Sequence, residues 1–188
     1  MKLLDFNTDF ASQKGFNGKA YYRLATITWS EPAVWNPSER CYSVPDGWAG
    51  HGGIYAFTRK HWLQSGKPKI AYIGKAKNFT DRLTNTHNHF GIVKRRGDTM
   101  VSCGRIAFDR VKSRVGFYLE IEDIVKFAVC DHLENSQGFE SLPGFRASQT
   151  RPMVPWVITN QGHLFGGMMP RRIVYPTIAV EYRMRRPE

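Results

Sequence analysis

The chain is poor in cysteine. Its 188 residues contain only three, Cys41, Cys103 and Cys130, and no two of them form a C-x-x-C pair. An odd number of widely spaced cysteines supports neither a disulfide framework nor a cysteine zinc site. A reducing compartment is the simplest setting, and we expect a cytoplasmic protein.

Long apolar runs, internal repeats and low-complexity segments are also missing from the sequence. No run approaches the length that crosses a membrane. No basic segment followed by an apolar one, as in a secretory signal, comes after Met1. Because 41% hydrophobic and 23% charged residues are globular values, we expect a single domain, residues 1–188, that has no membrane partner.

Acidic residues are few compared with basic ones. There are 16 Asp and Glu against 27 Lys and Arg, which gives a net charge of +11. Such an excess suggests a polyanionic partner, because binding to phosphates releases counterions. Between residues 91 and 116 seven basic residues accompany only two acidic ones. We expect this segment, with Lys94, Arg95 and Arg96, to face nucleic-acid phosphates.

Two short apolar runs organise the chain. Residues 53–57 (GIYAF) and 70–74 (IAYIG) are rich in β-branched and aromatic side chains and predict two strands. The connection between them is polar and contains a glycine and a proline, so we expect an antiparallel hairpin with a long loop. In such a hairpin Tyr55 and Tyr72 stand side by side.

A helix is predicted to begin directly after the second run. Asn78 is a good N-cap, and Asp81 three residues later resembles a capping box. Phe79 and Leu83 form an inward stripe with Arg82 beside it. A guanidinium at this position can return to the strand end that carries the tyrosines, so the sequence predicts a site there.

These residues resemble the GIY-YIG nuclease family. The two triplets of the family name stand at 53–55 and 72–74, and Arg82 matches the helix arginine. The run at 72–78 (YIGKAKN) is similar to the nuclease domain of bacterial excision-repair incision proteins. Two triplets, a lysine and an arginine at family spacing are far more specific than a lone glycine motif, although the match covers only about thirty residues.

The resemblance implies a phosphodiesterase site. Tyr72 would deprotonate the attacking water, Tyr55 would share its hydrogen-bond network, and Arg82 would bind the scissile phosphate as a planar bidentate donor. Tyrosine is a poor base at its reference pKa of about 10. A nearby cation that favours the phenolate is therefore needed, and Lys75, three residues after Tyr72, is predicted to supply it.

Residues 116–133 form the clearest helical pattern, with an apolar stripe at spacings of three and four. Glu122 lies on the flank of this stripe and is predicted to point inward, whereas Glu120 and Asp123 are expected to face solvent. By resemblance, Glu122, favoured over Glu120, would hold one Mg²⁺ (or Mn²⁺) ion. Such an ion would keep several waters and complete its shell with phosphate oxygens.

Two further family positions stay open. Relatives often carry a histidine or tyrosine one turn after the arginine, but that position is Thr86 here, and His87, one residue late, is the best local candidate. Many relatives also have an asparagine near a proline after the glutamate helix. Asn160, which follows the run PWVIT, suits that context better than Asn135, although Asn135 is nearer in sequence.

We expect an α+β fold in which a small antiparallel sheet is built on the hairpin and flanked by helices. The chain is predicted to divide into an N-terminal extension with one strand and a loop (1–50), a nuclease core (51–135) and a β-rich C-terminal segment (136–188). Further strands are predicted at 19–29, 101–111, 154–159 and 172–182. In the loop at 30–50, Trp35 and Trp48 either stack on bases or cover an edge of the core.

The expected function is a Mg²⁺-dependent endonuclease that hydrolyses double-stranded DNA. A restriction-type or phage-type enzyme fits best, because the segments outside the core are then available for recognition. A homodimer is expected if both strands are cut, since each chain has one site. The alternative is a protein of the same fold that binds nucleic acid without cleaving it, or that acts on RNA.

Overall fold

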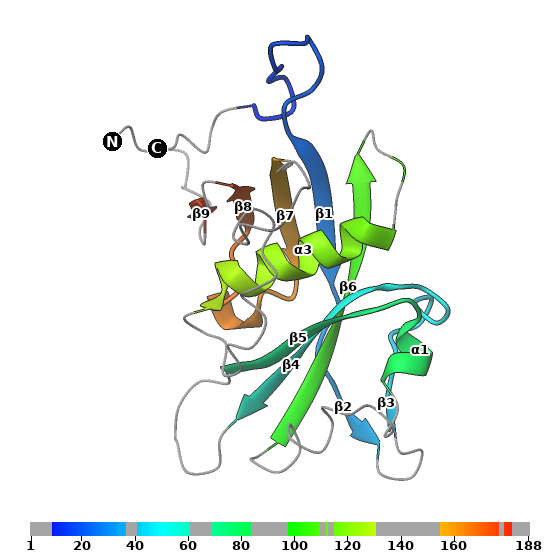
Figure 1. Cartoon of the computed structure of the whole chain (residues 1–188). Helices are drawn as coiled ribbons and strands as arrows, with labels where there is room; N and C mark the ends of the chain where they lie inside the picture. Colours follow the sequence, from blue (N-terminus) through cyan, green and yellow to red (C-terminus); the bar gives the residue numbers. More distant parts are fainter. Residues whose placement is uncertain are drawn as a thin grey trace, which may run out of the picture.

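The computed structural model is an α+β fold, and the described residues form one mixed nine-stranded sheet and two α-helices (Figure 1). The structure describes residues 9–36, 41–60, 69–83, 98–109, 112, 115–130, 155–176 and 179–181. The strands are β1 (Arg23–Trp29), β2 (Ala33–Asn36), β3 (Cys41–Tyr42), β4 (Gly53–Lys60), β5 (Lys69–Ala76), β6 (Asp98–Asp109), β7 (Trp156–Gly162), β8 (Arg172–Tyr175) and β9 (Ala179–Glu181). The helices are α1 (Phe79–Arg82) and α3 (Val115–Ala128), with a 3-10 turn, η3, at Phe165–Gly167.

The longest strand, β6, joins the two halves of the sheet. Its second half pairs antiparallel with β1, and its first half pairs antiparallel with β4 of the hairpin and with β2. β4 pairs on its other side with β5, which forms the edge among the described strands. Beyond β1 the sheet continues through β7, which is parallel to β1, to β8 and β9, which are antiparallel.

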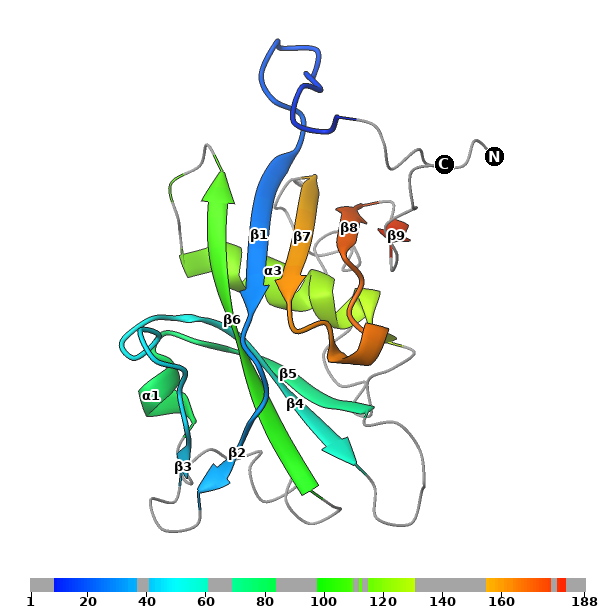
Figure 2. The same cartoon turned by 180° about the vertical axis from the view of Figure 1, so that it is seen from behind.

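Helix α3 covers one face of this sheet (Figure 1), and the view from behind shows β6, β1, β7 and β8 in front of the helix (Figure 2). Its buried residues Ile121, Ile124 and Val125 belong to a cluster with side chains from β1, β4, β5, β7 and β8. Apolar burial of this kind contributes roughly 25 cal/mol per Å². The same helix therefore holds the hairpin and the β1–β7 half together.

The other face of the hairpin has its own apolar cluster. Tyr55 and Phe57 of β4 pack there with Phe79 of α1, with Leu83 directly after α1, and with Tyr42 of β3. Phe79 and Leu83 are almost fully buried, as the inward stripe predicted. Burial of these two side chains fixes the short helix α1 against the strands that carry the tyrosines.

The predicted α+β class is confirmed, and so are the hairpin, the strands at β1, β6 and β7, and the helix at α3. The sheet is wider than the small antiparallel one we expected, because β1 and β7 join it and pair in parallel. The prediction of a loop for residues 30–50 is wrong in part, since β2 and β3 lie within it. The strand predicted at 172–182 is two strands, β8 and β9, and Pro176 lies between them.

Within the part of the chain that the structure describes, no helix has the length and apolar character needed to span a membrane.

Candidate active site

The two tyrosines of the triplets stand side by side, as predicted. Tyr55 of β4 is paired with Gly74 of β5, and Tyr72 is paired with Phe57, so both phenols project from the same face of the hairpin. Their ring centroids lie 6.0 Å apart at an interplanar angle of 33°. A Cβ atom on Gly74 would stand 2.5 Å from the Tyr55 hydroxyl and 2.6 Å from Cε1 of Tyr72. The glycine of the second triplet is therefore required for the two rings to approach.

Arg82 reaches this pair from α1. The Asn78 side chain accepts a hydrogen bond from the backbone N–H of Thr80 at 3.0 Å and donates one to Asp81 at 3.0 Å, so the predicted cap is confirmed. This cap fixes the start of the helix that carries Arg82. The Arg82 Nε then donates a hydrogen bond to the Tyr55 hydroxyl at 3.3 Å. The rest of the exposed Arg82 side chain faces solvent.

The environment of Tyr55 favours the neutral phenol. Burial raises the pKa of Tyr55, the nearby Tyr72 phenol raises it further, and the hydrogen bond and charge of Arg82 lower it. The upward effect prevails because the side chain is fully buried. Tyr55 therefore remains protonated at neutral pH and serves as a hydrogen-bonding partner of Arg82 rather than as a base.

Glu122 of α3 points into the structure, as predicted. Its carboxylate accepts a hydrogen bond from Nζ of Lys126, one helical turn later, at 2.6 Å. The side chains of Glu122 and Lys126 are only 8% and 15% exposed, so the pair is largely removed from water. The same ammonium lies 6.0 Å from the centroid of the Tyr72 ring. Lys126 thus connects the acid on α3 with the tyrosine on β5, a role that our reading of the sequence missed.

The expectation that Glu120 and Asp123 face solvent is wrong. Glu120 is partly buried and accepts a hydrogen bond from Trp156 Nε1 at 2.9 Å, and Arg23 lies 3.9 Å away. Asp123 is 5% exposed. The prediction failed for both residues because α3 packs over a broad sheet and buries more of its surface than the single apolar stripe. Glu120 is engaged with the β1–β7 half of the sheet, whereas Glu122 is linked to Tyr72 through Lys126.

Lys75 lies in a cleft beside the tyrosines but not on their face of the hairpin. It is paired with Ile54, whose side chain packs in the cluster under α3, whereas Tyr72 belongs to the cluster on the other face. An offset of three residues along a strand reverses the face, which is why the prediction that Lys75 supplies the cation next to Tyr72 is not supported. The cation at the Tyr72 ring is Lys126.

The cleft has a volume of about 830 Å³ and is more basic than acidic. It is lined by Gly52, Lys75, Ala76, Lys77, Asn78, Asp81, Arg82 and Tyr118, the last from α3. Three cations stand against one carboxylate in this lining, so the cleft suits an anion. Tyr72 and Glu122 do not line it, and Arg82 connects the cleft with the tyrosine pair through Tyr55.

Asn160 lies away from this cleft, in the core. Its side-chain oxygen accepts a hydrogen bond from Trp29 Nε1 at 3.0 Å, and its amide nitrogen donates one to the carbonyl of Pro170 at 2.7 Å. With 2% exposure, Asn160 joins β1 to the segment before β8. These contacts explain its presence structurally, and the predicted catalytic role for Asn160 gains no support from its position.

Several predicted residues lie outside the described part of the chain: His87, Asn135, Lys94, Arg95 and Arg96. Trp48 is described and packs against the cluster around Tyr55, with its ring 6.3 Å from that of Phe79. The guanidinium of Arg105 lies 5.6 Å from the Trp48 centroid. Of the two alternatives for Trp48, the position at the edge of the core agrees with these contacts.

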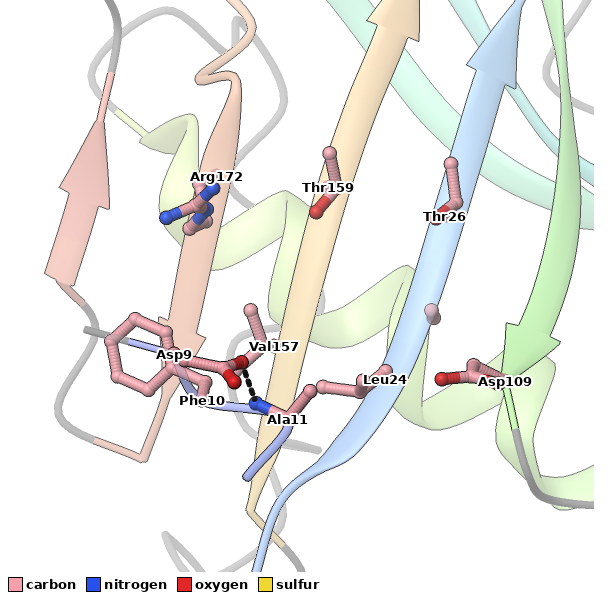
Figure 3. Close-up of a pocket in the computed structure, with 10 residues that line it drawn as sticks. Asp9, Phe10, Ala11, Leu24, Thr26, Asp109, Val157, Thr159 and Arg172 are labelled. Carbon is pink, nitrogen blue, oxygen red and sulfur yellow. Dashed lines mark hydrogen bonds between the residues drawn. The ribbon is translucent and has the colours of Figure 1, made fainter. Parts of the chain in front are cut away.

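A second hollow, of about 660 Å³, lies on the face of the sheet that α3 does not cover (Figure 3). Thr26, Thr159 and Arg172 form one row across β1, β7 and β8 there. Phe10 covers the neighbouring apolar row and leaves this polar row open. The Arg172 guanidinium lies 4.0 Å from Glu181. No predicted site residue lines this hollow, so we place the candidate site at the hairpin.

Comparison of the chain with protein-family models, with curated proteins and with solved structures found no match.

Proposed function

We propose that the protein is a divalent-cation-dependent endonuclease that hydrolyses phosphodiester bonds of double-stranded DNA, of the restriction or phage type. One observation carries the proposal: a chain of contacts joins four elements, from Arg82 of α1 through Tyr55 of β4 and Tyr72 of β5 to Lys126 and Glu122 of α3. The hydrogen bond from Arg82 to Tyr55 and the contacts of Lys126 with Glu122 and Tyr72 support it. The basic cleft beside them supports an anionic substrate.

In this proposal Arg82 binds the scissile phosphate. Its Nε is used by Tyr55, which leaves the terminal nitrogens of the planar guanidinium for two phosphate oxygens. Because Tyr55 is buried and neutral, it orients Arg82 without adding a negative charge near the phosphate. Positive charge held in place before the reaction stabilises the charge that develops on the phosphate oxygens in the transition state.

Tyr72 is the proposed acceptor of the proton from the attacking water. A bond forms between the water oxygen and phosphorus, and the water proton passes to the phenolate oxygen of Tyr72. The bond from phosphorus to the leaving oxygen breaks, and that oxygen becomes a hydroxyl by taking a proton from solvent. The ammonium of Lys126 near the Tyr72 ring offsets the negative charge of that phenolate. General base catalysis of this kind typically contributes about 10²–10⁴-fold in rate.

The residues present fit a hydrated divalent cation held by one carboxylate. Among the described residues no three His, Cys, Asp or Glu side chains cluster, so a cage made entirely of protein ligands does not fit there. Mg²⁺ commonly uses one or two carboxylates and keeps several waters, and Glu122 is a buried carboxylate that accepts a hydrogen bond from the ammonium of Lys126. When bound, such an ion would neutralise charge on the phosphate and on the leaving oxygen.

Incubation of the purified protein with supercoiled plasmid and Mg²⁺ tests the proposal. Wild type should nick or linearise the plasmid, chelation of the cation should stop the reaction, and Tyr72→Phe and Glu122→Gln should each reduce it strongly. Cleavage that survives both substitutions contradicts the assigned site. A wild-type protein that binds nucleic acid but leaves varied DNA and RNA substrates intact would instead be a binding protein.

A further inference from the structure

Lys126 forms an ion pair with the carboxylate of Glu122, the group that the proposed function assigns to a metal ion. Its Nζ lies 2.6 Å from Oε1 of Glu122, and both side chains are largely buried. At an exposed position an i, i+4 pair contributes little to stability. In a buried pair, however, each charge depends on the other, because loss of one partner leaves an uncompensated buried charge. The pair is therefore part of the site rather than a solvated pair on the helix surface.

We propose that Lys126 is the counter-ion that a divalent cation has to displace from Glu122, and that the displaced ammonium then forms an ion pair with a phosphate of the nucleic acid. This inference rests on the proposed function, in which Glu122 holds the cation. It makes cation binding and nucleic-acid binding depend on each other. The free protein would bind the cation weakly, and substrate would strengthen that binding.

The geometry supplies the reason for this dependence. A cation at Glu122 and the ammonium of Lys126 repel each other, and the largely buried ammonium then loses its carboxylate partner. The ammonium lies 6.0 Å from the centroid of the Tyr72 ring, and Tyr72 stands beside Tyr55, the partner of the arginine at which the substrate phosphate is proposed to bind. A phosphate there supplies the missing negative charge. By linkage, the factor by which DNA strengthens cation binding equals the factor by which the cation strengthens DNA binding.

Cation binding can be measured without any cleavage, by following free Mn²⁺ with electron paramagnetic resonance. Wild type and the variants Lys126→Met, Lys126→Gln and Lys126→Arg are compared in the absence of nucleic acid. Removal of the ammonium should tighten Mn²⁺ binding by at least about fivefold, the low end of common coupling factors. Lys126→Arg, which keeps the charge, should bind Mn²⁺ as weakly as wild type.

Lys19→Met is the matched control, because Lys19 is exposed on the N-terminal turn and lies outside the site. It removes the same charge from the protein and should leave Mn²⁺ affinity unchanged. Repeating the measurement with a short DNA duplex in the Tyr72→Phe background gives the second readout. DNA should tighten Mn²⁺ binding when Lys126 is present and should do so much less in the Lys126→Met protein.

Equal Mn²⁺ affinities for wild type, Lys126→Met and Lys126→Gln, with native circular dichroism for both variants, would contradict the role proposed for Lys126. That result would leave the proposed function intact. Mn²⁺ binding that is unchanged in Glu122→Gln would instead contradict the proposed function, because Glu122 would then not be the ligand. The two failures are therefore distinguishable.

Discussion

The Nε of Arg82 donates a hydrogen bond to the hydroxyl of Tyr55 at 3.3 Å, between residues that are 27 positions apart in the chain. One partner is exposed and the other is fully buried. The contact therefore joins a cation that a ligand can reach to a rigid position in the sheet.

Arg82→Lys is expected to lower the cleavage rate by about 10²-fold or more, the usual effect of losing one donor aimed at developing charge. Lysine keeps the charge but loses the planar donor that contacts Tyr55 and a phosphate together. Single-turnover cleavage of a labelled duplex measures the effect. Lys77→Met, in the same cleft, is the control and should weaken binding with little effect on the rate.

Substitution of the two tyrosines is expected to lower the cleavage rate by different amounts. Tyr72→Phe removes the proposed proton acceptor and should lower the single-turnover rate by about 10²–10⁴-fold. Tyr55→Phe removes only a neutral partner of Arg82, and its effect should be smaller because Arg82 retains its charge. A larger loss with Tyr55→Phe than with Tyr72→Phe would reverse the assigned roles.

Gly74→Ala should damage both stability and activity. The new methyl group would lie 2.5 Å from the Tyr55 hydroxyl and 2.6 Å from the Tyr72 ring, so one of the rings has to move. Overpacking of this kind costs about 1–3 kcal/mol. Urea denaturation followed by circular dichroism measures the loss of stability, and the plasmid assay measures the loss of cleavage.

The matched control for this prediction is Gly116→Ala. Gly116 lies in α3, and a Cβ atom there meets nothing within 4 Å. Alanine is favoured over glycine in a helix by about 1 kcal/mol, so this variant should be as stable as wild type or more stable. A similar loss of stability in both variants would contradict the packing argument at Gly74.

Stability should fall at alkaline pH. Burial raises the pKa of Tyr42 and, as the main cause, that of Tyr55, and it raises the pKa of Cys103 to about 12. The unfolded chain releases these protons near pH 9–10, whereas the folded protein keeps them. The stabilisation is therefore complete below about pH 9 and is lost progressively as the pH rises toward the raised values.

Tyr42→Phe should make this decline less steep, by up to about 1.4 kcal/mol per pH unit above pH 10. The free energy of unfolding, measured by urea denaturation between pH 7 and pH 11, gives the slope. An unchanged slope would mean that the Tyr42 phenol does not contribute to the pH dependence.

Local patterns predicted the features that depend on neighbours in sequence. The hairpin strands, the cap at Asn78 and the inward positions of Phe79 and Glu122 all follow from spacing within a few residues, and all are present. β2 and β3 were missed because they are short. β2 is held by pairing with β6, which lies more than sixty residues further along the chain, and β3 is held by pairing with β2. No local signal specifies such a partner.

The errors in the site have similar causes. Asn160 was assigned to the site from a nearby proline, but its partner Trp29 is 131 residues away and was not visible in the sequence. Lys126 stands four residues after Glu122, a spacing that was available to us. Such pairs are usually exposed on helices, and only the packing of α3 against the sheet shows that this one is largely buried.

The most direct test of the central claim is a double-variant cycle in single-turnover cleavage of a defined DNA duplex. If Tyr72 and Glu122 serve one phosphodiesterase site, Tyr72→Phe, Glu122→Gln and the combined variant should all be reduced to similar rates, because residues that act as a unit are not additive. Full additivity of the two losses, or cleavage by the combined variant at the wild-type rate, would contradict a single site formed by these residues.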